Sequence, residues 1–275
     1  MALGAVHAAS DDAPPRRDAG DCKRAQFRVI LDVGHTAEVP GAKSARGAME
    51  YDFNLRLAKE VNQKLVDAGF DRTVLMITAG PARASLFRRV ALANRFPADL
   101  FLSIHHDSVP NRFMQDWEYD GKPRHFSDRF KGHSIFISNE NGERRASLQF
   151  GRLLGLRLKE HGLTYTPHYT EPFMGSRQRE LVDPEAGVYR YDQLIVLRMT
   201  RMPAVLLEAG SIINRDEELD MASPEREAVI ADAVTEAVTA FCVARAPAPD
   251  RVRPVVAGGK RGLRPGTAAE ANAHR

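Results

Sequence analysis

Short apolar runs alternate with amphipathic segments through the middle of this chain. The runs are typical of buried strands, which we expect at 27–33, 73–78, 99–105, 134–138 and 203–208. Between them, apolar residues recur at helical spacing over 50–68, 84–96, 143–161 and 224–243. Residues 188–200 should hold a further short helix or strand. Strands that alternate with helices predict an α/β fold, a single domain whose mostly parallel or mixed central sheet has about six strands, with helices on both faces.

Polar segments separate and flank these elements. Two loops, 108–132 and 163–187, are long enough to suggest a functional role. Residues 1–25 are polar and predict a flexible N-terminal segment. The tail 245–275 is rich in Pro, Ala, Gly and Arg, a composition that predicts disorder. The folded domain is therefore expected to span residues 26–244.

Composition argues against two classes of partner. The 275-residue chain has a net charge of +3, and its basic residues are spread out except in the tail. Aromatic residues make up only 7% and do not interleave with blocks of Lys or Arg, so we expect no nucleic-acid partner. No apolar run is long enough for a membrane span. The charge permits an anionic polymer as a partner without indicating one.

Two features bear on the compartment. Residues 6–8, Val-His-Ala, have the small-x-small form of a signal-peptidase site, although no charged and apolar regions precede them. The segment is either the remnant of a signal-peptide region in an exported protein or an ordinary terminus. The only cysteines, Cys22 and Cys242, flank the folded region outside any metal-binding pattern. In an exported protein they would form a disulfide, and the alternative is two unpaired thiols.

Three of the predicted strands lead into titratable side chains, which are His35, His105 and Glu208. Gly34 lets the backbone turn sharply at the end of the first strand. Because parallel strands of an α/β sheet present their carboxyl ends at one edge, these side chains are expected at one site. Glu50 opens the next helix, and the intervening loop can bring it back beside His35.

These residues suggest metal chemistry without proving it. His35, Glu50 and His105 would form a His2Glu set, the arrangement of a catalytic zinc with one open position. By spacing alone, each histidine is more typical of an ordinary rim or core residue, and Glu50 is more typical of a charge at a helix N-terminus. Glu208 ends an all-apolar strand, where burial would raise its pKa as general acid or base work requires. The alternative for Glu208 is a capping or ion-paired glutamate.

Several stretches taken together resemble a known family. They are 32–35 (Asp-Val-Gly-His), 40–42, 47–55, 98–105, 196–198 and 202–210, with Leu86, Arg89, Asn94 and Asn214. In this order they resemble the zinc-dependent N-acetylmuramoyl-L-alanine amidases, the cell-wall amidases of the cell-separation type. The resemblance covers nearly all of the expected domain, and several motifs in register are far more specific than any one of them.

The resemblance implies a set of site residues, a reaction and a cellular compartment. His35, Glu50 and His105 would bind Zn²⁺, and Glu208 would be the catalytic carboxylate. The enzyme would hydrolyse the amide between the lactyl group of N-acetylmuramic acid and the L-alanine of the peptidoglycan stem peptide, in cell-wall remodelling and daughter-cell separation. We therefore expect a periplasmic or otherwise exported hydrolase with peptidoglycan as substrate, an activator protein as a possible further partner, and a monomer as the default state.

Other functions stay open at this point. One is a carboxypeptidase-like zinc peptidase on a similar fold, and another is a non-catalytic cell-wall-binding or regulatory module. The presence of all four chemical groups argues against the second. Three further residues fall on family positions: Asp32 would support the ligands from behind, and Arg89 and Asn94 would be structural.

The chain also departs from the family pattern. Thr36 and Ala37 stand where the family often has Gly-Gly, and His106 and Asp107 stand where it often has Ala-Asn. As the strand neighbour of His105, His106 is expected to point away from the metal. The alternatives are that it orients substrate or competes as a ligand.

Self-inhibition is a further question that the family raises. Some members carry a long helix whose glutamate occupies the open zinc position. Loops 108–132 and 163–187 show no such amphipathic helix. The alternative is a blocking carboxylate such as Glu171 or Glu180, and we expect weaker self-inhibition.

Overall fold

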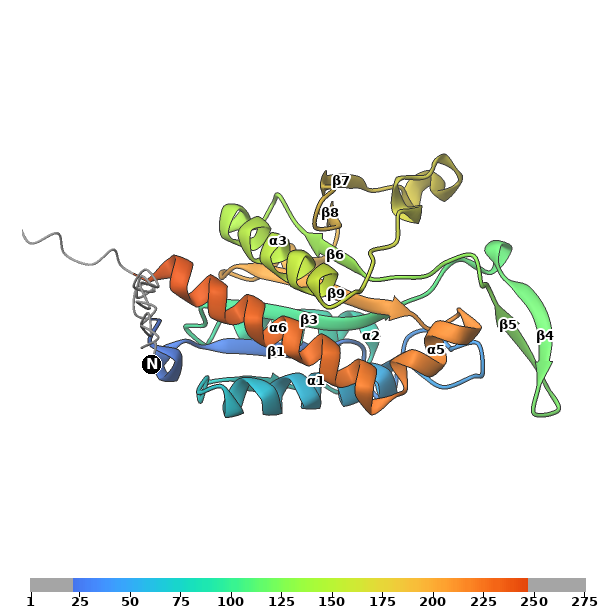
Figure 1. Cartoon of the computed structure of the whole chain (residues 1–275), viewed down its shortest axis with the longest axis horizontal. Helices are drawn as coiled ribbons and strands as arrows, with labels where there is room; N and C mark the ends of the chain where they lie inside the picture. Colours follow the sequence, from blue (N-terminus) through green and yellow to red (C-terminus); the bar gives the residue numbers. More distant parts are fainter. Residues whose placement is uncertain (1–21, 247–275) are drawn as a thin grey trace, which may run out of the picture.

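A seven-stranded mixed sheet lies at the centre of the computed structural model, which describes residues 22–246 (Figure 1). In spatial order the strands are β2 (Val74–Met76), β1 (Val29–Val33), β3 (Leu100–Asp107), β9 (Ala204–Ser211), β6 (Ser134–Ile137), β8 (Val188–Arg190) and β7 (Glu180–Asp183). The first four run parallel, β6 is antiparallel to β9, and β7 is antiparallel to β8. The predicted α/β domain with a mixed sheet is confirmed, with seven strands where about six were expected.

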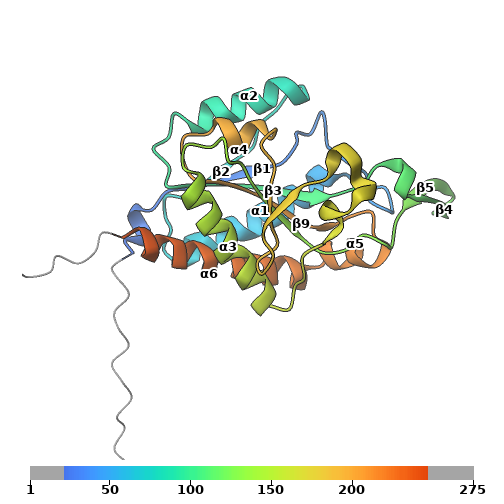
Figure 2. The ribbon, with the colours of Figure 1, turned by 90° about the horizontal axis from the view of Figure 1, so that it is seen from above.

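Helices cover both faces of this sheet (Figure 2). One layer contains α1 (Glu50–Asp67), α3 (Arg144–Glu160) and α6 (Pro224–Arg245), and the other contains α2 (Ala82–Ala93) and α4 (Ile195–Met199). Alternate residues of β1 face opposite layers: Leu31 packs in the core under α1 and α6, and Ile30 in the core under α2 and α4. Burial on both faces explains why the central strands read as continuous apolar runs.

The segment predicted as loop 163–187 contains short elements that the pattern did not predict. It holds two 3-10 helices, η3 (His168–Thr170) and η4 (Pro172–Arg177), followed by β7 at the sheet edge. The edge strand β7 has only four residues, all at least partly accessible. Such a short edge strand carries too few apolar residues to be recognised by periodicity. The short helix α5 (Arg215–Met221) was missed for the same reason. The three-residue strand β8 and the helix α4 fall within 188–200, where a short helix or strand was predicted.

The loop 108–132 contains a β-hairpin made of β4 (Gln115–Tyr119) and β5 (Lys122–Phe126), preceded by η2 (Asn111–Phe113). Its two-residue turn, Asp120-Gly121, has φ angles of 53° and 64°, the positive values that a tight hairpin turn requires. The hairpin stands away from the sheet, at the end toward which β9 points (Figure 1). Asp-Gly is a hairpin signal that the sequence contained, but the mostly exposed flanking residues lack apolar alternation.

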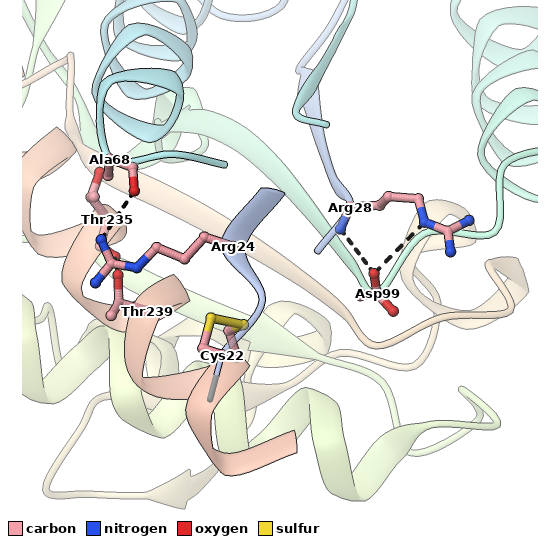
Figure 3. Close-up of a disulfide and its surroundings, with 8 residues drawn as sticks. Cys22, Arg24, Arg28, Ala68, Asp99, Thr235 and Thr239 are labelled. Carbon is pink, nitrogen blue, oxygen red and sulfur yellow. Dashed lines mark hydrogen bonds and ion pairs between the residues drawn. A yellow bond between two sulfur atoms is a disulfide. The ribbon is translucent and has the colours of Figure 1, made fainter. Parts of the chain in front are cut away.

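A disulfide joins Cys22 to Cys242 in α6 (Figure 3). The structure therefore favours pairing over two unpaired thiols. Next to it, the short helix η1 (Arg24–Gln26) begins, and Arg24 donates a hydrogen bond of 3.0 Å to the carbonyl of Ala68 after α1. The described chain is thus held in place four residues before the predicted boundary at 26.

The predictions for residues 1–21, including the signal-peptidase site, and for the tail 247–275 lie outside the described residues. Within 22–246, the helices include none that is both long and apolar enough to cross a membrane.

We predict that the disulfide contributes substantially to stability, because it closes a loop with a sequence separation of 220. Replacing both Cys22 and Cys242 by Ser should lower the free energy of unfolding by about 2–5 kcal/mol. Urea denaturation followed by circular dichroism measures this. Dithiothreitol should lower the midpoint of the wild type and leave that of the double variant unchanged. Equal midpoints for wild type and double variant without reductant would contradict the prediction.

Candidate metal centre

The parallel strands β1, β3 and β9 bring the predicted site residues to one edge of the sheet. In the β3–β9 register His105 lies opposite Glu208, and in the β1–β3 register Val33 lies opposite Ile104. His35 follows β1 by two residues and therefore reaches the same edge. Paired residues of parallel strands project to the same face, which places His105 and Glu208 side by side.

Glu50 joins this group as the first residue of α1. Its Oε2 atom lies 3.0 Å from Nε2 of His35, and its Oε1 atom lies 3.0 Å from Nδ1 of His105. The donor atoms of the three side chains all lie within 4.8 Å of one another. The structure thus brings together the three residues that the sequence predicts as metal ligands.

Two glycines give these side chains the space that they occupy. A Cβ atom on Gly34 would lie 2.5 Å from the imidazole of His105. A Cβ atom on Gly41 would lie 2.4 Å from Oε2 of Glu50, and Gly41 also has a φ of 80°. The glycine of the Asp-x-Gly-His motif therefore makes room for a histidine from the neighbouring strand.

Glu50 is buried, yet it is held as a carboxylate. Burial alone raises its pKa, but the hydrogen bonds and the charges of His105 and His35 together outweigh that effect and hold the pKa of Glu50 well below its usual value. Its Oε2 atom also accepts a hydrogen bond of 3.0 Å from the backbone N–H of Ala42, and its Oε1 atom accepts one of 3.3 Å from Asn54. These partners fix the orientation of the carboxylate toward the histidines.

His106 lies on the other face of β3, against α1. Its Nδ1 atom is 2.8 Å from Oδ1 of Asn54, and its ring packs against Phe53. Burial lowers the pKa of His106 to about 3, so the ring is neutral at ordinary pH. Through Asn54, which also donates to Glu50, His106 stabilises the ligand group from behind. His106 contributes no atom to the group of candidate ligands, which agrees with the prediction that it points away from the metal.

Arg89 of α2 holds the backbone at His35. Its guanidinium donates to the carbonyl of His35, to Thr78 at 2.9 Å, and to the carboxylate of Asp32 at 3.4 Å. His35 has a φ of 65°, an uncommon conformation for a residue with a side chain, and this carbonyl contact supports it. Asp32 also accepts a hydrogen bond of 2.7 Å from Ser103.

Asn94 has a structural place at the other end of α2. Its side chain donates to the carbonyl of Met199 at 3.0 Å and accepts from the N–H of Arg201 at 2.8 Å. These bonds connect α2 to the segment that leads into β9.

The carboxyl group of Glu208 is incompletely hydrogen-bonded within the described residues. Its Oε2 atom is buried and has no hydrogen-bond partner among the described residues. Burial raises the pKa of Glu208 well above its usual value, and the charges of Asp107 and Glu50 raise it further, while Arg177 opposes them. A carboxyl group with a raised pKa holds a proton more readily, as general acid or base work requires.

A pocket of about 440 Å³ contains the three candidate ligands and Glu208. Its wall includes residues that were not predicted to belong to the site, among them Asp107, Tyr169, Arg177 and Arg179. Asp107 accepts hydrogen bonds of 2.8 and 2.9 Å from the hydroxyl of Tyr169. The only sequence signal for the last three was the unusual length of the loop that carries them.

The two carboxylates that we named as candidate blocking groups lie elsewhere. Glu180 pairs with Arg190 at 3.1 Å, and Glu171 is an exposed residue between η3 and η4. Neither lines the pocket that holds the candidate ligands.

Comparison with known proteins identifies the family. A family model described as N-acetylmuramoyl-L-alanine amidase matches residues 29–240. The chain belongs to the N-acetylmuramoyl-L-alanine amidase family. It is therefore a hydrolase of the class that cuts an amide bond in the peptidoglycan of the cell wall.

Individual amidases agree with this assignment over most of their length. A putative N-acetylmuramoyl-L-alanine amidase of Buchnera aphidicola is 22% identical over 218 residues, which are 79% of this chain and 97% of that protein. The crystal structure of Ami1 from Mycobacterium smegmatis has a TM-score of 0.62 at 20% identity and covers 80% of this chain and 98% of its own. The CwlD amidase from Clostridioides difficile, solved in complex with the GerS lipoprotein, has a TM-score of 0.57 at 17% identity. The match covers 78% of this chain and 98% of the CwlD chain. At these identities the two structures establish a shared fold.

We predict that Gly34→Ala displaces the imidazole of His105 and weakens Zn²⁺ binding. The added methyl would meet a side chain rather than backbone, so the fold should survive while the affinity falls by about 10- to 100-fold. Zinc titration against a competing chelator measures this. Gly142→Ala is the matched control, because its Cβ would meet no atom within 4 Å. Equal zinc affinities for the two variants would contradict the prediction.

Proposed function

We propose that this amidase uses one zinc ion to hydrolyse the amide between the lactyl group of N-acetylmuramic acid and the L-alanine of the stem peptide. The observation that carries the proposal is the convergence of His35, Glu50 and His105 beside the unpartnered carboxyl oxygen of Glu208. The family membership of the chain supplies the substrate class.

The side chains present fit a catalytic zinc. Two imidazoles and a carboxylate are donors that zinc accepts, and three protein ligands leave a position for water. The spaces beside Gly34 and Gly41 are filled by the ligands themselves, which supports a site built for these side chains. When bound, zinc supplies a water of lowered pKa and polarises a carbonyl oxygen.

Glu208 is proposed to move the proton during the reaction. As the water oxygen bonds to the lactyl carbonyl carbon, the Glu208 carboxylate takes the water proton. As the carbon–nitrogen bond breaks, Glu208 gives that proton to the departing amine of L-alanine. The products are a lactyl carboxylate on the sugar and a peptide with a free amino terminus. The raised pKa of Glu208 supports the second step, because the protonated form persists until the amine departs.

Two neighbouring pockets support binding of an extended polymer. A second pocket, of about 360 Å³, lies between loop residues 42–47 and the hairpin strand β5, and its wall shares Ala42 and Ser108 with the first. Glycan and peptide would then lie on opposite sides of the metal. Of these two pockets only the first contains Glu208, so we propose that the departing peptide lies there and the glycan in the second.

The setting is proposed to be the periplasm or another exported compartment. The Cys22–Cys242 disulfide supports this, because such bonds persist in oxidising surroundings. An activator protein is a further candidate partner, and the complex of the related CwlD amidase with the GerS lipoprotein is a precedent. A monomer is the default state that we propose.

Replacing Glu208 by Gln should preserve zinc binding and abolish turnover. Loss of the proton-carrying group is expected to lower kcat by about 10²- to 10⁴-fold. Zinc content by atomic absorption, together with digestion of purified sacculi, tests this. His105→Ala is the matched contrast, since it should lose both metal and activity. A Glu208→Gln enzyme that digests sacculi at the wild-type rate would overturn the proposed role.

Analysis of the released ends separates the amidase from a zinc peptidase. The amidase leaves muramic acid with a free lactyl carboxylate and releases peptides that start with L-alanine. A carboxypeptidase-like enzyme would instead release single amino acids and leave the lactyl amide intact. The non-catalytic alternative predicts neither product.

A further inference from the structure

One cation in the amidase pocket has no partner among the residues that the structure describes. Of the arginines that line it, Arg89 is committed to Asp32 and to the His35 carbonyl. Arg179 lies 3.7 Å above the ring of Tyr191 and donates to two neighbouring backbone carbonyls. Arg177 is exposed, and its guanidinium makes no hydrogen bond or ion pair within residues 22–246. As an exposed residue of the pocket wall, Arg177 has donors that are available to a ligand.

The segment that carries Arg177 is anchored to the catalytic edge of the sheet. The hydroxyl of Tyr169 donates to Asp107 at the end of β3, and the N–H of Arg179 donates to the carbonyl of Tyr169 at 2.7 Å. Met174, between them, is buried. The position of the Arg177 backbone relative to β3 is thus fixed by contacts on both sides, although its side chain has no partner in the described part of the chain.

Arg177 lines the pocket in which we propose that the departing peptide lies. Glu208, the group proposed to protonate the amine, lines the same pocket, and so does Asp107. The second pocket, where we place glycan, contains neither Glu208 nor Arg177. A ligand group for Arg177 should therefore belong to the peptide, close to the L-alanine that departs.

We propose that Arg177 binds a free carboxylate on the stem-peptide residue that follows L-alanine and makes the enzyme select for it. This inference rests on the proposed function. That residue is joined to the next through its side-chain carboxyl, so its α-carboxyl is either free or amidated. It lies one residue, about 3.8 Å between Cα atoms, beyond the alanine. A guanidinium forms paired, charge-assisted hydrogen bonds with a carboxylate that a neutral amide cannot match.

The test compares two synthetic substrates whose side-chain carboxyl is blocked by a further residue, muramoyl-L-alanyl-γ-D-glutamyl-L-lysine with a free α-carboxyl and its counterpart with that α-carboxyl amidated, using zinc-loaded full-length protein. The wild type should have a kcat/KM about 10- to 100-fold higher for the free carboxylate, the range expected for a hydrogen-bonded charge pair. In Arg177→Gln this ratio should fall to about one. Arg177→Lys should give an intermediate ratio, because it keeps the charge and loses the paired geometry.

Arg145→Gln is the matched control, an exposed arginine of α3 that does not line the pocket, and it should keep the wild-type ratio. The inference is overturned if the wild type does not discriminate between the substrates, or if Arg177→Gln keeps the wild-type ratio. A wild type that cleaves neither compound nor sacculi would overturn the proposed function and this inference with it, so the two failures are distinguishable.

Discussion

The ionised carboxylate of Glu50 is the group around which the catalytic edge is built. Burying an isolated carboxylate costs several kcal/mol unless charges and hydrogen bonds compensate. Here the compensation comes from four directions: the two imidazoles of His35 and His105, the N–H of Ala42, and the amide of Asn54. Each of these partners comes from a different part of the chain or a different turn of α1. The geometry of the centre therefore depends on the whole fold.

The sheet supplies this convergence through its parallel registers. β1, β3 and β9 end at the same edge, and the β3–β9 pairing places His105 beside Glu208 without any contribution from loops. The two faces of β3 have separate tasks. His105 faces the pocket, whereas His106 faces α1 and supports Glu50 through Asn54. Arg89 completes the arrangement from α2, because it holds the carbonyl of His35 in an uncommon backbone conformation.

The sequence predicted the parts of this molecule that depend on burial and missed those that depend on tertiary contact. Strands β1, β3 and β9 were recognisable because burial on both faces produces continuous apolar runs. Glu208 stood out as a charge at the end of such a run. The proximity of Glu50 to the histidines could not be derived from spacing, because a loop of 14 residues separates it from His35. For that step the resemblance to a family was needed. The position of Arg177 was hidden for a similar reason, since the Tyr169–Asp107 contact that places it joins residues 62 positions apart.

Two acidic side chains at this edge, Asp107 and Glu208, have raised pKa values. Their different hydrogen-bond partners give them different roles. Burial raises the pKa of Asp107 to about 7, but both of its oxygens accept hydrogen bonds from Tyr169, and Ser108 donates to it as well. A carboxyl group engaged in this way positions the segment that carries Arg177. Glu208 has the opposite character, because its buried Oε2 atom lacks a partner among the described residues. A buried acceptor without a partner costs free energy in the resting protein. That cost is tolerable where a water molecule or an amine occupies the position during the reaction. The same edge of the sheet therefore holds one carboxyl group that organises the pocket and one that is left available for proton transfer.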